Sequence, residues 1–196
     1  NDTTLAYHKY LDQQQQQFLK YKAQVEQKWG RFKGSTQKIH VDYDQDLNAR
    51  GTIDFEKGKL EVEVLIDDKV DEKNLSQKQI GKAKLEEKIS QMVSSKADDG
   101  KPLLDNQLKT NAGNIVSNQN AKNYAKEVVN DKKIKKKSIK SKDGKRRVKY
   151  TVTINLLPDH LEIRAKRFKD IVVDQSSRFG IDPALVLAIM HTESNF

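Results

Sequence analysis

The chain has 196 residues, 35% of them hydrophobic and 33% charged, and its lack of cysteine excludes disulfides and thiolate metal sites. The longest apolar run, residues 184–190, covers seven residues, far short of the roughly 18 that span a bilayer. The net charge of +9 is local, because residues 132–149 hold eleven Lys and Arg against one Asp and the rest of the chain is nearly neutral.

The N-terminal residues predict a long helix that stops near Gly30 and Gly34. Its apolar residues recur at spacings of three, four and seven, which places them on one face of a helix. The run of glutamines at 13–17 is interpreted as a solvated helical turn, because glutamine is a fair helix former. The apolar face consists of Leu11, Phe18, Tyr21, Val25, Trp29 and Phe32.

Three strands are predicted next, because apolar and polar residues alternate along them. The Lys-Gly pair at 57–58 predicts a two-residue turn between the second and third strands, with glycine supplying the positive φ. Such a turn sets Phe55 opposite Leu60 and Ile53 opposite Val62, so that the apolar residues of both strands share one face. The strands are expected at residues 39–43, 49–55 and 60–66.

The middle of the chain combines helical and irregular segments with a basic hairpin. Helical periodicity covers residues 75–92, an irregular segment rich in Asn, Asp and Gly covers 98–120, and a short helix is expected around 124–129. The Asp-Gly pair at 143–144 is a strong type I′ turn signal. The strand after it, 147–156, alternates between an apolar face and a cationic, hydroxylic face.

These elements predict an α+β fold, in which an antiparallel sheet of about five strands is packed with helices on one face. Pro158 ends the sheet region, so residues 1–157 are expected to form one α+β domain and 158–196 the start of another. The second region begins with one predicted helix from Pro158 to Phe179, which Gly180 closes in a left-handed cap.

The last helix carries the most specific motif in the chain. Asp182 is the predicted N-cap and Pro183 the first helical residue, and the helix runs through an apolar stretch to His-Thr-Glu-Ser-Asn-Phe at 191–196. The pattern resembles the opening of soluble-lytic-transglycosylase-type catalytic domains, where Ile-Asp-Pro-x-Leu leads to Glu-Ser-x-Phe. One membrane-bound member of that family is most similar, and the resemblance extends through its N-terminal domain. It implies that 158–196 begin an all-α, lysozyme-like domain that is truncated after the catalytic glutamate.

The resemblance also implies a reaction and assigns its residues. Glu193 would protonate the β-1,4 glycosidic oxygen between N-acetylmuramic acid and N-acetylglucosamine, and would then deprotonate the muramyl 6-hydroxyl to close a 1,6-anhydro ring, with Ser194 orienting it. A second carboxylate is not within reach, because Asp182 lies roughly 16 Å away along the helix. Ile189 and Met190 place apolar side chains one turn before Glu193, and burial favours the protonated carboxyl that a general acid needs.

Parts of the family pattern are missing from these residues. The later Gly-Leu-Met-Gln-type segment and the helices of the substrate groove do not occur, so we expect this chain alone to be inactive. The apolar residues 184–190 then lack their normal partner, and we expect them to dock onto the N-terminal domain or to cause self-association. Whether the parent protein cuts within glycan strands or at their ends is left open.

The basic hairpin is a second candidate site, for a binding module rather than an enzyme. Its cations could meet the carboxylates of cell-wall peptides or anionic lipid headgroups, and the alternative is a solvated strand face without a partner. Nucleic acid is disfavoured, because Tyr150 is the only aromatic residue among the cations. The candidate binding residues are Lys135, Lys136, Lys137, Arg146, Arg147 and Lys149.

No cofactor or metal is predicted, since the four histidines, at 8, 40, 160 and 191, lack ligand spacing. The chain opens on Asn-Asp-Thr-Thr without a charged-then-apolar leader, which favours a mature or trimmed form. The family resemblance implies a periplasmic protein that acts on peptidoglycan. It also implies a lipid anchor to the outer membrane in the full-length protein.

Overall fold

The fold is built on one five-stranded antiparallel sheet with strand order β1-β2-β3-β5-β4, which confirms the predicted α+β class. The computed structural model describes all residues except 1, 69–75, 98, 132–133 and 195. The strands are β1 (Ile39–Tyr43), β2 (Ala49–Asp54), β3 (Lys59–Asp67), β4 (Lys135–Lys140) and β5 (Arg146–Asn155). The helices are α1 (Asp2–Trp29), α2 (Gln77–Ser94), α3 (Ala121–Asp131), α4 (His160–Lys166), α5 (Lys169–Phe179) and α6 (Pro183–Ser194).

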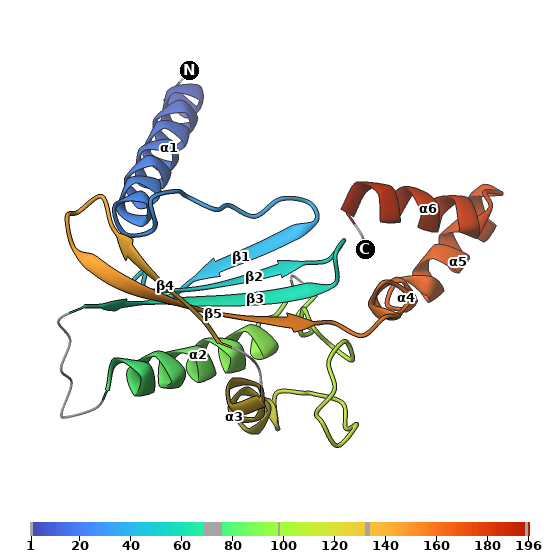
Figure 1. Cartoon of the computed structure of the whole chain (residues 1–196). Helices are drawn as coiled ribbons and strands as arrows, with labels where there is room; N and C mark the ends of the chain where they lie inside the picture. The colour runs from blue at the N-terminus through green and yellow to red at the C-terminus, as the bar shows by residue number, and fades with distance from the viewer. Residues whose placement is uncertain (1, 69–75, 98, 132–133, 195) are drawn as a thin grey trace.

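Helices α2 and α3 cover one face of the sheet and enclose the core with it (Figure 1). The start of α2 is set by a capping box, in which Ser76 and Gln79 each satisfy the other's backbone N–H. A glycine in β2 lets α2 approach closely, because a Cβ on Gly51 would lie 2.1 Å from the sulfur of Met92. The most deeply buried residues include Ile53, Leu60, Val62, Val64, Leu85, Ile89, Met92 and Val152.

Helix α1 stands on the other side of the sheet, at one end (Figure 1), so the prediction that all helices cover one face is wrong for α1. It ends at Trp29, and Gly30 follows with φ +80°, so Phe32 of the predicted apolar face lies beyond the helix. Of the face that periodicity predicted, Val25 is fully buried, but Leu11 and Phe18 are 43% and 51% exposed. The reason is that only the last turns reach the sheet, and the first half of α1 projects away from it.

The hairpin between β2 and β3 has a longer loop than predicted. Asp54 pairs with Lys59 and Ile53 with Leu60, so the predicted pairs of Phe55 with Leu60 and Ile53 with Val62 are wrong by two residues. The turn takes up residues 55–58, and the Asp54 carboxylate stabilises it by accepting the Lys57 N–H at 2.9 Å. Because a shift of two residues preserves the alternation, the predicted shared apolar face is retained.

The turn between β4 and β5 also differs from the predicted type I′ geometry. Gly144 has φ +81°, but Asp143 is not in the left-handed region, which a type I′ turn requires at both central residues. The Gly144 N–H instead donates to the Ser141 carbonyl at 3.0 Å, and the Ser141 N–H donates to the Lys145 carbonyl. This pattern fits a type I turn followed by a left-handed glycine, the usual three-residue hairpin loop.

The helix predicted from Pro158 to Phe179 is two helices, α4 and α5. It breaks at Arg167, whose guanidinium pairs with Asp99 at 2.8 Å and so holds the break against the 98–120 segment. The predicted left-handed cap at Gly180 and N-cap at Asp182 are both confirmed, since Gly180 has φ 65° and Asp182 accepts the Ala184 N–H at 2.8 Å. Helix α2 begins at Gln77, and the predicted start at Leu75 lies outside the described residues.

Candidate functional site

The Glu193 side chain lies exposed near the end of α6. Ser194 is half-buried, and its hydroxyl donates to the carbonyl of Met190, one turn earlier, at 3.1 Å. In this structure Ser194 therefore bonds to its own helix rather than to the Glu193 carboxylate. His191 stacks on Phe196, with ring centroids 5.7 Å apart, on the same short terminal stretch.

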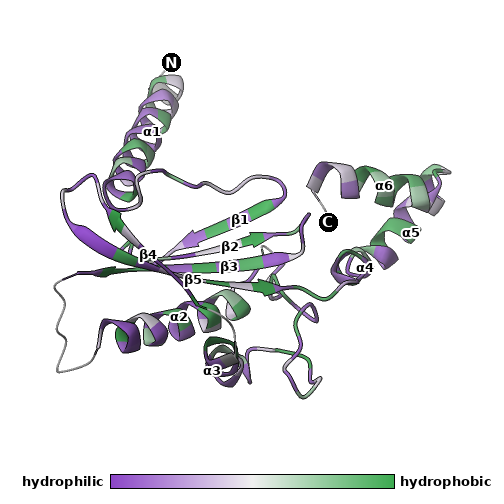
Figure 2. Ribbon diagram, viewed as in Figure 1, coloured by the Kyte–Doolittle hydropathy of each residue, from purple (hydrophilic) through white to green (hydrophobic). Residues whose placement is uncertain are grey.

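The surface of α6 is apolar and uncovered. Figure 2 shows most of α6 in the hydrophobic colour, yet none of its residues is buried. Helix α6 packs on α5. It does not lie against the sheet (Figure 1), so the predicted docking of residues 184–190 onto the N-terminal domain is not seen. Large exposed apolar side chains on and around these two helices are Ile171, Val173, Phe179, Ile181, Leu185 and Ile189.

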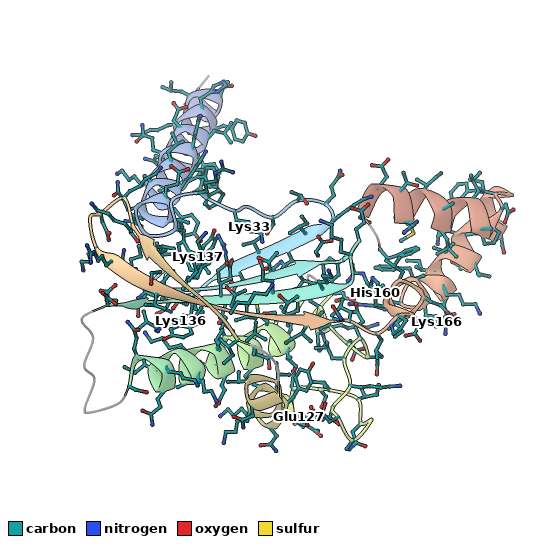
Figure 3. The ribbon with its side chains drawn as sticks, viewed as in Figure 1. Lys33, Glu127, Lys136, Lys137, His160 and Lys166 are labelled. Carbon is teal, nitrogen blue, oxygen red and sulfur yellow. The ribbon has the colours of Figure 1, made fainter. Side chains whose placement is uncertain are left out.

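The terminal helices are attached to the sheet through α4. The ring of His160 (labelled in Figure 3) is buried, with Nδ1 2.9 Å from the Leu157 carbonyl and Nε2 2.9 Å from the Phe55 carbonyl. The Arg164 guanidinium stacks over the Phe55 ring, 3.7 Å from its centroid. Burial, together with the neighbouring Arg167, lowers the pKa of Arg164 to about 10. These contacts fix where α4 leaves the sheet and so where α5 and α6 begin.

The basic hairpin divides into cations that face solvent and cations that are neutralised within the fold. Lys135, Lys136, Lys137 and Arg146 are exposed, and none of them has an ion pair among the described residues. Figure 3 places Lys136 on the α2 side of the sheet and Lys137 on the α1 side. On the α2 side, the Lys136 ammonium lies 5.8 Å from the ring of Tyr150.

Arg147 is an internal part of the hairpin, since its side chain is only 3% exposed. Its Nε lies 2.7 Å from the Asp67 carboxylate, and its two terminal nitrogens donate to both oxygens of Asp143 at 2.8 and 2.7 Å. The bonds from Arg147 are the main cause that lowers the pKa of Asp143 to about 2. Arg147 therefore stabilises the turn, and the carboxylates of Asp67 and Asp143 neutralise its charge.

Lys149 belongs to a second internal network, centred on the buried Glu63. The Lys149 ammonium lies 2.6 Å from one Glu63 oxygen, and Arg50 binds the other oxygen. Burial by itself raises the pKa of Glu63, but the charges and hydrogen bonds of Arg50 and Lys149 outweigh it and lower the pKa overall. Arg50 also stacks over Trp29 at 4.4 Å, which ties the network to the end of α1.

The described residues offer neither a metal site nor a membrane-spanning helix. They contain no group of three or more His, Asp or Glu placed to hold a metal ion. Nor do they contain a helix that is both long enough and apolar enough to cross a bilayer. The candidate chemistry thus rests on Glu193 in α6 and on the exposed cations of the hairpin.

Comparison with known proteins identifies the family. Residues 6–167 match the family model for the membrane-bound lytic murein transglycosylase C N-terminal domain. The chain belongs to this family. Two relatives from Klebsiella pneumoniae strains, both named membrane-bound lytic murein transglycosylase C, are 31% and 32% identical over 166 residues. The aligned region is 81% of this chain and 44% of each relative, so the chain spans less than half the length of these relatives.

The match to the transglycosylase C N-terminal domain confirms the suspected family. It covers the sheet, α2, α3 and α4, and it ends at residue 167, between α4 and α5. The motif with Glu193 lies after the matched residues. The predicted division at residue 157, and the roles assigned to Glu193 and Ser194, therefore stay predictions.

Proposed function

We propose that the chain is the N-terminal accessory domain of a peptidoglycan lytic transglycosylase, joined to the first helices of its catalytic domain. The family match over residues 6–167 is the observation that carries this proposal, and the names of the Klebsiella relatives support it. The Glu193-Ser194 pair lies at the end of α6, and its resemblance to the family's Glu-Ser motif supports Glu193 as the catalytic glutamate. In the parent protein, the substrate is the glycan strand of the cell wall.

The proposed reaction uses one carboxyl group in two steps. Glu193 gives its proton to the oxygen of the bond between N-acetylmuramic acid and N-acetylglucosamine as that bond breaks. The resulting carboxylate then accepts the proton of the muramyl 6-hydroxyl, whose oxygen attacks the anomeric carbon and closes the 1,6-anhydro ring. No water is consumed. Ser194 positions the carboxyl group, and its hydroxyl can donate to the Glu193 carboxylate only after it leaves the Met190 carbonyl that it contacts in this structure.

The chain by itself is proposed to be inactive. Glu193 is exposed and α6 buries none of its residues, so water reaches the carboxyl group instead of being excluded from it. Digestion of isolated sacculi tests this. A form extended by the part of a family catalytic domain that follows its Glu-Ser motif should release fragments with 1,6-anhydromuramyl ends, and residues 1–196 should release none. Anhydro products from 1–196, or none from the extended form, would contradict the proposal.

The second candidate function is a non-catalytic role in which the basic hairpin holds the protein at an anionic surface. Lys135, Lys136, Lys137 and Arg146 are exposed and have no ion pair with any residue that the structure describes, which favours this role over a purely structural one. Co-sedimentation with sacculi and with anionic vesicles, at low and high salt, tests it, with RNA as the control polyanion. Binding that is sensitive to salt and absent for RNA would support this function.

Location and self-association complete the proposal. The relatives are named membrane-bound, and we place this protein in the periplasm with a lipid anchor to the outer membrane in its full-length form. The apolar side chains exposed on α5 and α6 are covered by later helices in the parent protein. In the isolated chain, the face around residues 184–190 instead drives self-association.

A further inference from the structure

Strand β4 forms one edge of the sheet, and its outer edge is open. Among the described residues it pairs only with β5, so the N–H and C=O groups that point outward have no strand partner. Five of the six residues of β4 are exposed, and the sixth, Ile139, is half-buried. An open edge can accept another extended chain by main-chain hydrogen bonds, but the lysines along β4 oppose pairing with any strand that does not carry acidic side chains.

The cations of β4 point to both faces of the sheet. Lys135 and Lys137 lie opposite Thr151 and Lys149, on the face away from α2. Lys136 and Lys140 lie on the α2 face, and Figure 3 shows the separation for Lys136 and Lys137. A flat membrane meets one face of a sheet at a time, whereas the side chains of an added strand alternate between both faces. The distribution of charge therefore favours an extended peptide over a lipid surface.

The hairpin also contains unfavourable pairs of like charge. Lys140 lies directly opposite Arg146, and both are exposed without an ion pair among the described residues. Lys137 lies opposite Lys149, and the Lys149 ammonium forms an ion pair with Glu63. Like charges directly opposite each other destabilise a strand pair. Carboxylates of a partner along this edge would relieve that repulsion.

A hollow of about 300 Å³ lies beside the end of β4, next to Lys140 and Arg146. It is also lined by Ser138, Arg147 and Asp68, so one carboxylate already lies at its wall. The Arg147 charge is matched by Asp67 and Asp143, which leaves Lys140 and Arg146 to meet a further acidic side chain.

The edge is held rigid, which lowers the entropy lost on binding. The Ser141 hydroxyl donates to the Lys28 carbonyl of α1 at 2.7 Å, and the Asp143 N–H donates to the Gln27 carbonyl at 3.2 Å. Lys142 adds an ion pair to Glu26 at 3.6 Å. The end of α1 thus fixes the tip of the hairpin, and the direction in which β4 presents its open edge.

We propose that the open edge of β4 binds an extended acidic peptide segment of a partner protein, which adds to the sheet as a sixth strand. Main-chain bonds to β4 supply its orientation, and carboxylates on both faces of the added strand meet Lys135, Lys136, Lys137 and Lys140. This inference does not rest on the transglycosylase reaction. It assigns the basic hairpin an extended acidic peptide as its partner, instead of an anionic surface.

The test measures binding of two synthetic peptides to the 196-residue chain. The first is a short peptide of Glu, Thr and Val with glutamates at consecutive positions, and the second is the same peptide N-methylated at alternate backbone amides. We expect the first to bind, to protect β4 amides from hydrogen exchange, and to bind at least about tenfold more tightly than the methylated peptide. Equal affinity for both peptides means that charge alone acts and overturns the proposal.

Matched variants and a lipid probe complete the design. Changing Lys135, Lys136 and Lys137 together to Gln should weaken peptide binding about tenfold. The same change at Lys122, Lys126 and Lys169, which are exposed on α3 and α5, removes equal charge and should leave binding unchanged. Circular dichroism checks that both triple variants fold. Equal losses in the two variants, no peptide binding at all, or binding only to phosphatidylglycerol vesicles would each overturn the proposal.

Discussion

The Glu63 network allows a quantitative test of how the sheet domain is held together. The Glu63 side chain is 4% exposed, and its partners Arg50 and Lys149 are 12% and 27% exposed. Glu63→Gln keeps the shape but leaves two cations beside a neutral amide, and loss of one partner of a buried pair costs about 3–5 kcal/mol. Since Lys149 is partly exposed and can turn to solvent, we expect the free energy of unfolding to fall by about 3 kcal/mol.

A neighbouring glutamate on the same strand is the matched control. Glu61 pairs with Lys33 at 3.4 Å, and their side chains are 39% and 36% exposed, so Glu61→Gln should cost less than about 1 kcal/mol. Urea unfolding followed by circular dichroism measures both variants, and the midpoint should shift clearly only for Glu63→Gln. Equal losses for the two variants would refute the reasoning that burial makes the Glu63 network important.

Three other perturbations follow from the structure. Gly51→Ala should lower stability by about 1–3 kcal/mol in urea unfolding, because the new Cβ would lie 2.1 Å from the Met92 sulfur. In a chain that carries Met92→Ala, Gly51→Ala should cost less than it does beside Met92, and an equal cost in both chains would contradict the packing argument. Arg147 lowers the pKa of Asp143 from 3.8 to about 2, so this contribution to stability is complete above the unfolded value and is lost as the pH falls through about 2. Asp143→Asn should show a smaller loss of stability over that acid range, and an unchanged acid profile would count against the ion pair. Leu185→Lys should reduce self-association of the isolated chain in light scattering after size exclusion, because Leu185 is 55% exposed on α6, and a monomeric unmodified chain would contradict this.

Local patterns predicted the strands well because their information lies within a few residues. The alternation around Val62 and Val152 marks buried positions directly, and both residues are fully buried. The register of β2 and β3 was predicted wrongly, because the Asp54 carboxylate supports a four-residue loop that the Lys-Gly pair alone does not indicate. The shared apolar face was still predicted, since the error was an even number of residues.

Long-range contacts account for what the sequence did not reveal. The sequence pattern places Arg147 and Lys149 on one cationic face of the strand. In the structure, Arg147 pairs with Asp67 and Lys149 with Glu63, and both carboxylates are distant in sequence. Periodicity along α1 shows which side chains share a face, but it does not show which of them are buried. Only the end of the helix near Val25 packs against the sheet. For the candidate catalytic site, the motif indicates Glu193, but it does not reveal that the Glu193 side chain is exposed at the end of α6.

Glu193 is proposed as the single general acid and base of a lytic transglycosylase. Digestion of sacculi tests this with a form extended by the part of a family catalytic domain that follows its Glu-Ser motif, so that Glu193 supplies the only motif glutamate. This form carries either Glu193→Gln or the control Glu162→Gln, an exposed glutamate of α4 paired with Lys166. Mass spectrometry of the released fragments scores 1,6-anhydromuramyl ends. We expect anhydro products from the unmodified and Glu162→Gln forms and none from Glu193→Gln. Anhydro products from the Glu193→Gln form would contradict it.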